Sequence, residues 1–179
     1  MNVPARTVAL IGLMGSGKSA VGRRLAARLD RPFRDTDTLI EQATGLRVAE
    51  IFARHGEATF RRHERQLIAR LPADHAGTVL ALGGGMFVGA ANIEAIRAAC
   101  FTVWLRVSPH VALERLGREP GTVRPLLDGA DPAARLEALD RERRPWYARA
   151  DAWVDVDGPG VDAVVERVME LLVGAGPCA

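Results

Sequence analysis

The stretch GLMGSGKS, residues 12–19, decides the fold of this chain. It fits the pattern G-x-x-x-x-G-K-[ST], it follows an apolar run (7–12) typical of a buried strand, and it precedes helical spacing over 18–30. A loop in this context binds polyphosphate, because inward-turned backbone N–H groups and the positive end of the helix together form an anion cradle. We therefore expect the chain to bind ATP or GTP.

Lys18 is the only lysine in the chain, because every other residue among its 24 basic residues is arginine. A compact ammonium can reach between the β- and γ-phosphates, whereas a guanidinium is planar and wider. The Ser19 hydroxyl is suited to Mg²⁺. The expected nucleotide contacts in and beside the loop are Gly12, Met14, Gly15, Ser16, Gly17, Lys18, Ser19 and Ala20.

The composition is typical of a single globular domain and gives no sign of a nucleic-acid or membrane partner. The chain has 179 residues, 48% of them hydrophobic, and a net charge of +2, which gives no reason to expect nucleic acid or a membrane surface as a partner. Cys100 and Cys178 lie far apart, and the histidines lack metal-ligand spacing. We expect a cytoplasmic protein without a disulfide framework, and a monomer, since no large apolar stripe is left unassigned.

Strand and helix patterns alternate along the chain. Strand patterns occur at 7–12, 31–35, 78–85, 101–107 and 152–156. Helical patterns lie between them, including two short helices over 38–45 and 47–56 and a longer one over 57–71. Several strands are continuously apolar, which predicts an α/β fold with a parallel sheet covered by helices. Residues 117–130 are rich in Gly and Pro and form a candidate lid.

Two aspartates in DTD, Asp35 and Asp37, follow the second strand pattern, near the expected mouth of the phosphate loop. One could serve Mg²⁺, and the other could bind or deprotonate an acceptor hydroxyl. The alternative is a helix N-cap, because aspartate favours that position and a helix follows. Both interpretations can hold, for different aspartates.

Glycines and arginines supply further candidates. Gly83, Gly84 and Gly85 suit a close backbone approach to a ligand, although an ordinary tight turn is the alternative. Arg124, in the candidate lid, could reach the transferred phosphate. Arginines in FRRHE (60–64) and RERRPWY (141–147) could bind a carboxylate bidentately, although such arginines are more often surface charges.

The phosphate loop, DTD, FRRHE, GGG, VRPLL (123–127) and RRPWY (143–147) occur in an order and at separations that resemble shikimate kinase, over nearly the whole chain. The resemblance implies a nucleoside monophosphate kinase-like P-loop sandwich with a five-stranded parallel sheet, a lid at about 117–130 and a mobile substrate-binding segment at about 36–71. It also implies phosphorylation of the 3-hydroxyl of shikimate by ATP with Mg²⁺. Another small-molecule P-loop kinase, such as a gluconate-type enzyme, and a non-catalytic shikimate sensor are the alternatives.

The resemblance assigns a role to each matching residue. Lys18, Asp37 and Arg124 would be catalytic, with Asp37 as the candidate base at the ring hydroxyls. Ser19 and Asp35 would serve Mg²⁺. The shikimate contacts would be Asp37, Phe60, Arg61, Gly83, Gly84, Gly85 and Arg143, and the adenine would lie near Arg118 and Pro159. Met86 and Phe87 are bulkier than the small residue common after the glycines.

Overall fold

A five-stranded parallel sheet forms the centre of the molecule, whose computed structural model describes residues 6–118, 125–127 and 131–174. The strands are β1 (Thr7–Ile11), β2 (Phe33–Asp35), β3 (Val79–Ala81), β4 (Cys100–Arg106) and β5 (Ala152–Asp155), in the order β2-β3-β1-β4-β5. All five residues of β1 are buried, as its continuous apolar run predicts. The predicted α/β fold and all five strands are confirmed. Because β1 is the central strand, the loop that follows it lies at the middle of the carboxyl end of the sheet.

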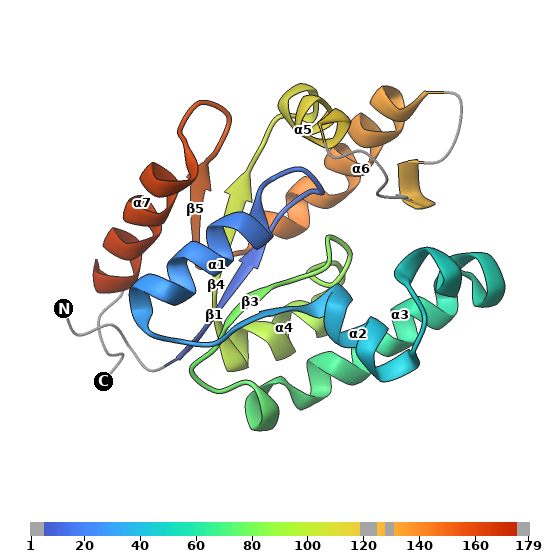
Figure 1. Cartoon of the computed structure of the whole chain (residues 1–179), viewed down its shortest axis with the longest axis horizontal. Helices are drawn as coiled ribbons and strands as arrows, with labels where there is room; N and C mark the ends of the chain where they lie inside the picture. The colour runs from blue at the N-terminus through green and yellow to red at the C-terminus, as the bar shows by residue number, and fades with distance from the viewer. Residues whose placement is uncertain (1–5, 119–124, 128–130, 175–179) are drawn as a thin grey trace.

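Helices cover the sheet and join its strands (Figure 1). In the described residues they are α1 (Lys18–Leu29), α2 (Thr36–Thr44), α3 (Val48–Asp74), α4 (Ala90–Ala99), α5 (Pro109–Gly117), α6 (Pro132–Tyr147) and α7 (Val161–Gly174), with a 3₁₀ turn at Pro125–Leu127. This turn is the one described part of the predicted lid beyond residue 118. Among the described residues, no helix has both the length and the apolar character that a membrane crossing requires.

Two of these helices begin where a capping residue precedes a proline. Ser108 accepts a hydrogen bond from Val111 N at the start of α5, and Asp131 accepts one from Ala134 N at the start of α6. Each is followed by proline at the first helical position, where the missing N–H would have no partner in any case. The sequence pattern therefore fixes both helix starts locally.

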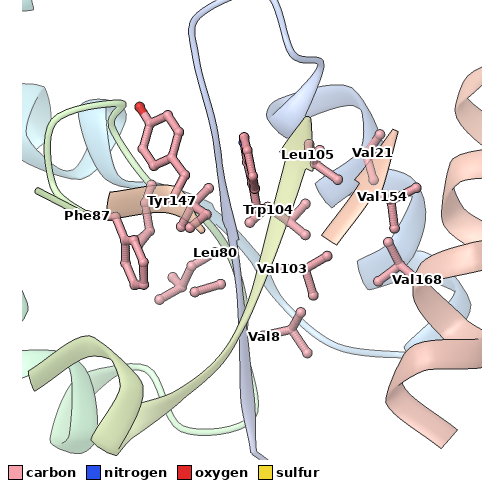
Figure 2. Packing of buried hydrophobic residues seen from close by; sticks show 14 of the residues in the cluster. Val8, Val21, Leu80, Phe87, Val103, Trp104, Leu105, Tyr147, Val154 and Val168 are labelled. Atoms are coloured by element: carbon pink, nitrogen blue, oxygen red, sulfur yellow. The ribbon is translucent and has the colours of Figure 1, made fainter. Parts of the chain in front are cut away.

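The main hydrophobic core lies on both faces of the sheet. Figure 2 shows Val21 of α1 and Val168 of α7 on one side, and Tyr147 of α6 and Phe87 on the other. Trp104 on β4 packs beside Tyr147, with 5.9 Å between ring centroids. These layers hold the carboxyl ends of the strands in a fixed arrangement, on which the site is built.

A second, smaller apolar cluster holds the segment that follows β2. Its buried members are Ile40 of α2 and Ile51 and Phe60 of α3. Between the last two, α3 is kinked at Gly56, whose φ of 76° and ψ of 166° are not helical. The sequence predicts two helices here, over 47–56 and 57–71, and the kink is their boundary. Gly56 permits it because glycine adopts positive φ without a steric penalty.

Candidate active site

The phosphate loop, residues 12–17, connects the end of β1 to the first residue of α1. Gly12, Gly15 and Gly17 have φ values of 143°, 77° and 84°. A Cβ on Gly15 would also lie 2.6 Å from Ala112 O of α5, so the neighbouring backbone excludes a side chain there. The expected unusual dihedrals are confirmed. In this structure the glycines bring the loop close to the backbone of neighbouring elements, such as α5 at Ala112.

The start of α1 is arranged to receive an anion. Gly17 precedes the helix and offers no side-chain cap, and the first turn carries no acidic residue. The first N–H groups of the helix and the positive end of its dipole therefore face the loop. Lys18 lies across this loop, where its Nζ donates to Gly12 O at 3.0 Å and Leu13 O at 2.8 Å. The ammonium therefore lies against the backbone of the phosphate loop.

Asp35 joins the phosphate loop to the start of α2. Its Oδ2 accepts a hydrogen bond from Ser19 Oγ at 2.7 Å, and its Oδ1 accepts one from Asp37 N at 3.1 Å. Asp35 is therefore the N-cap of α2 and also the partner of the predicted magnesium-binding hydroxyl. The sequence interpretation gave these two roles to different aspartates, but one carboxylate has both contacts.

Asp37 lies in the first turn of α2 with its Oδ1 buried and without a hydrogen-bond partner. Burial raises the pKa of Asp37 to about 6, and the negative charge of Asp35 adds to the rise, whereas Lys18 opposes it. A carboxylate with this pKa is ionised in most molecules at neutral pH and is a better proton acceptor than an ordinary aspartate. A buried carboxylate with a raised pKa is typical of residues that take part in catalysis or ligand binding.

Thr36, between the two aspartates, was not among the predicted site residues. Its buried hydroxyl donates to Ala81 O at 3.2 Å and accepts from Gly83 N at 2.8 Å. It therefore links the end of β2 to the end of β3 and fixes the glycine segment beside Asp37. The signal in the sequence was its place in the middle of the DTD motif.

Arg61, Glu64 and Arg143 form a charged cluster beside Asp37, in which Glu64 and Arg143 are buried and Arg61 is partly exposed. Arg61 Nη1 donates to Glu64 Oε2 at 2.8 Å, and only 2% of the Glu64 side chain is exposed. Burial raises the pKa of Glu64, and Arg61 and then Arg143 oppose that rise. Within the part of the chain that the structure describes, Glu64 Oε1, Arg143 Nη1 and Asp37 Oδ1 are buried and have no hydrogen-bond partner. Since buried polar atoms are normally paired, these three atoms indicate a binding site for a polar ligand.

The three consecutive glycines lie against this cluster. A Cβ on Gly83 would lie 2.7 Å from Asp37 Oδ1, and one on Gly84 would lie 2.9 Å from Arg143 Nη1. A Cβ on Gly85 would overlap the guanidinium of Arg61. The glycines therefore make room for the charged side chains that surround the site, which is a requirement beyond that of an ordinary turn.

One cleft of about 910 Å³ contains both the phosphate loop and this cluster. Predicted site residues on its wall include Pro159 and Phe60, the latter stacked against Phe52 with ring centroids 5.1 Å apart. The others along its wall are Met14, Gly15, Ser16, Gly17, Lys18, Ser19, Ala20, Asp35, Asp37, Arg61, Gly83, Gly84, Gly85 and Arg143. Residues far apart in the sequence are thus brought to one site.

Gly12, Arg118 and Arg124 differ from the other predicted site residues. Gly12 is not on the wall of the cleft. Arg118 is not on the wall of the cleft, because it ends α5 and pairs with Glu114 with 74% of its side chain exposed. Arg115, one turn earlier, lines the cleft instead and donates to Gly15 O at 3.4 Å and to Val156 O. Arg124 lies outside the described residues.

The two bulky residues after the glycines do not narrow the cleft. Met86 and Phe87 are fully buried members of the main core, and Figure 2 shows Phe87 packed on one face of the sheet. Neither residue is on the cleft wall. The bulk of these two side chains is therefore accommodated in the core and not in the cleft.

A family profile described as shikimate kinase matches residues 14–173. The chain belongs to the shikimate kinase family. It is 45% identical over 170 residues to a shikimate kinase of Symbiobacterium thermophilum, with 94% of this chain and 97% of that protein covered. It is also 45% identical to one of Moorella thermoacetica, covering 92% and 93% of the two chains. The predicted resemblance is confirmed.

Solved structures of the family share the fold over almost the whole chain. The shikimate kinase from Acinetobacter baumannii in complex with shikimate has a TM-score of 0.89, with 31% identity over 96% of this chain and 95% of that one. A gluconokinase from Sinorhizobium meliloti has a TM-score of 0.62 at 17% identity, covering 97% and 95% of the two chains, which shows a shared fold alone. The predicted P-loop kinase fold is confirmed.

Proposed function

We propose that this chain transfers the terminal phosphoryl group of ATP to the 3-hydroxyl of shikimate. One observation carries the proposal beyond family membership. A phosphate loop and a pair of arginines suited to a carboxylate face a single cleft, with Asp37 on the wall that they share. Shikimate has a carboxylate at one end and hydroxyls at the other, so this distribution of charge complements it.

Arg61 and Arg143 would bind the carboxylate of shikimate. They come from different helices, α3 and α6, and both lie beside the three glycines. Arg143 Nη1 is buried without a hydrogen-bond partner, so an incoming carboxylate oxygen would supply one. Charge-assisted hydrogen bonds of this kind are stronger than neutral ones.

Asp37 would accept a hydrogen bond from the acceptor hydroxyl and receive its proton. Its Oδ1 is unpartnered and its pKa of about 6 favours proton acceptance near neutral pH. The charge that develops on the transferred group would be balanced by Lys18 and by the N–H groups of the phosphate loop. Arg124 would add a further positive charge from the lid.

Ser19 and Asp35 fit a magnesium ion that accompanies ATP. Their oxygens lie 2.7 Å apart at the start of α1, and both are donor types that Mg²⁺ accepts. When bound, the ion would neutralise charge on the phosphates. Among the described residues, no group of three or more His, Cys, Asp and Glu side chains is placed to hold a metal ion. A magnesium ion that accompanies ATP is usually held by one or two carboxylates together with phosphates and water.

A coupled assay of ADP release tests the proposal against a panel of hydroxy acids. We expect turnover that depends on shikimate, ATP and Mg²⁺. Turnover with gluconate and none with shikimate would instead support the gluconate-type alternative. Thermal stabilisation by shikimate without any turnover would support a sensor.

Replacement of Arg61 by alanine tests the substrate end of the cleft. We expect the KM for shikimate to rise far more than the KM for ATP, because the lost hydrogen bonds would go to the carboxylate of shikimate. Arg62→Ala is the matched control, since Arg62 is its neighbour, is exposed and lies off the cleft wall. An unchanged shikimate KM in Arg61→Ala would show that the carboxylate binds elsewhere.

A further inference from the structure

Arg61 is already bound to carboxylates on two sides of its guanidinium. Its Nε and Nη2 donate to Glu57 Oε1 at 3.1 and 2.7 Å, and its Nη1 donates to Glu64 Oε2 at 2.8 Å. All three nitrogens therefore have a glutamate partner. Nε and Nη2 form one edge of the guanidinium, and this edge can bind a carboxylate through two parallel hydrogen bonds. In this structure both of its nitrogens donate to Glu57.

The two glutamates differ in exposure. The Glu64 side chain is 2% exposed, whereas the Glu57 side chain is 51% exposed. Removing Glu64 from Arg61 would leave a buried charge without its partner, which is costly. Glu57 can instead turn into water, and an exposed ion pair four residues apart on a helix contributes little stability. Glu64 is therefore a permanent partner and Glu57 a replaceable one.

The charges in direct contact with Arg61 favour exchange of one carboxylate for another. Its guanidinium is already paired with the carboxylates of Glu57 and Glu64. A ligand carboxylate that joined both glutamates would place three negative charges around one guanidinium. If Glu57 moves away as the ligand arrives, the charge around Arg61 stays the same.

We propose that Glu57 is an internal competitor for the substrate carboxylate, a role that rests on the proposed function. In the ligand-free site it occupies the edge of Arg61 that shikimate requires. Shikimate displaces it, and Glu57 moves into solvent. A neutral ligand cannot replace its charge, so Glu57 also makes the site selective for anions over uncharged polyols.

Replacement of Glu57 by glutamine tests the proposal by calorimetric titration of the full chain with shikimate. Glutamine keeps the size of the side chain but weakens its hold on Arg61, so we expect the Kd for shikimate to fall about two- to fivefold. The Kd for ATP should not change. A shikimate analogue with a neutral carboxamide should gain nothing from the substitution, because it cannot exchange one carboxylate for another.

Glu50→Gln is the matched control. Glu50 precedes Arg54 by four residues on the same helix, as Glu57 precedes Arg61, and its side chain is 41% exposed. Unlike Glu57, it does not line the smaller pocket that shares Arg61 and Arg143 with the cleft, and glutamine retains the acceptor that caps Arg47 N. The affinity of this variant for shikimate should match that of the unmodified chain.

An unchanged or weaker affinity of Glu57→Gln for shikimate would overturn the proposal, as would an equal gain for the carboxamide. These outcomes are distinct from a failure of the proposed function, in which the unmodified chain would neither bind nor phosphorylate shikimate. A lower shikimate KM in Glu57→Gln with an unchanged ATP KM would support the proposal by a second route.

Discussion

Ser19 Oγ donates a 2.7 Å hydrogen bond to Asp35 Oδ2, although sixteen residues separate the two in the chain. This contact joins the first turn of α1 to the carboxyl end of β2. It thereby places a hydroxyl and a carboxylate side by side at the entrance to the phosphate loop. The same carboxylate caps α2, so its proposed role in metal binding and its role as a cap must be separated by experiment.

Asp35→Asn separates those roles. Asparagine caps helices as well as aspartate does, so we expect the fold to keep its stability. Loss of the negative charge should raise the Mg²⁺ concentration for half-maximal activity by about 10- to 100-fold. Titration of the activity with Mg²⁺ measures this. Asp131→Asn, which alters the cap of α6, should leave the Mg²⁺ requirement unchanged.

Lys18→Arg keeps the charge and changes the shape. The Lys18 ammonium donates to two carbonyls of a tight loop, and a planar guanidinium would not fit the same space. We expect kcat to fall by about 10²-fold or more with little change in the melting temperature. Near-normal kcat in this variant would contradict the explanation for the single lysine.

Asp37 predicts a dependence of activity and stability on pH. Its pKa of about 6 lies above the value of 3.8 for an unburied aspartate. The folded chain therefore holds more protons than the unfolded chain between these values, and its contribution to stability falls as pH rises through this window. Activity should instead be lost as pH falls below about 6, because Asp37 becomes protonated.

The variant Asp37→Asn removes this charge. At pH 7 we expect the free energy of unfolding to rise by about 2 kcal/mol, since the buried charge is gone. We expect kcat to fall by about 10²- to 10⁴-fold. Urea unfolding at pH 7 and pH 4 distinguishes the effect, because the gain should be much smaller at pH 4. Equal gains at both pH values would contradict the burial argument.

Glu64→Ala should destabilise the fold and disturb the substrate end of the cleft. It breaks a nearly buried ion pair and leaves Arg61 without its permanent partner, at a cost of about 3 kcal/mol in the free energy of unfolding. The shikimate KM should rise with the ATP KM unchanged. Glu170→Ala is the control, because its pair with Arg167 is exposed and should contribute less than about 1 kcal/mol.

Gly85→Ala should affect substrate binding far more than stability. The added methyl group would overlap the end of the flexible Arg61 side chain, which can move away at small cost. Because Arg61 would then leave its position, we expect the shikimate KM to rise about tenfold, a change equivalent to about 1.4 kcal/mol. Gly174→Ala, whose added methyl group would meet no described residue within 4 Å, should change neither the shikimate KM nor the stability.

The phosphate loop and the parallel sheet could be predicted because their signals are local. A continuous apolar run, glycines at fixed spacing and a helical pattern suffice for the β1–loop–α1 unit. The helix starts of α5 and α6 were equally local, since each cap lies beside its proline. Such features need no knowledge of distant contacts.

Glu64 was missed although the sequence carried a signal for it. Phe60, Glu64, Ile68 and Leu71 are buried at helical spacing along α3, so Glu64 occupies an otherwise apolar face. The same reasoning distinguishes Arg143 from Arg144. Arg143 continues the buried stripe of Leu136 and Leu139 on α6. Arg144 instead pairs with Asp140, and 47% of the Arg144 side chain is exposed.

The position of Arg115 could not be predicted in this way. Its place on the cleft wall depends on how α5 packs against the phosphate loop, a contact between segments 100 residues apart. Spacing within α5 shows only that Arg115 and Arg118 lie about one turn apart. The dual role of Asp35 is similar, because a pattern can assign a cap or a ligand but cannot show that one carboxylate makes both contacts.

The smaller apolar cluster around Ile40, Ile51 and Phe60 has an evolutionary consequence. It supports α2 and the first part of α3, and partly buried Leu67 joins it to the main core that holds the phosphate loop. Changes around the smaller cluster therefore need not disturb the core beneath the phosphate loop. One phosphate-binding scaffold can in this way be adapted to acceptors of different chemistry.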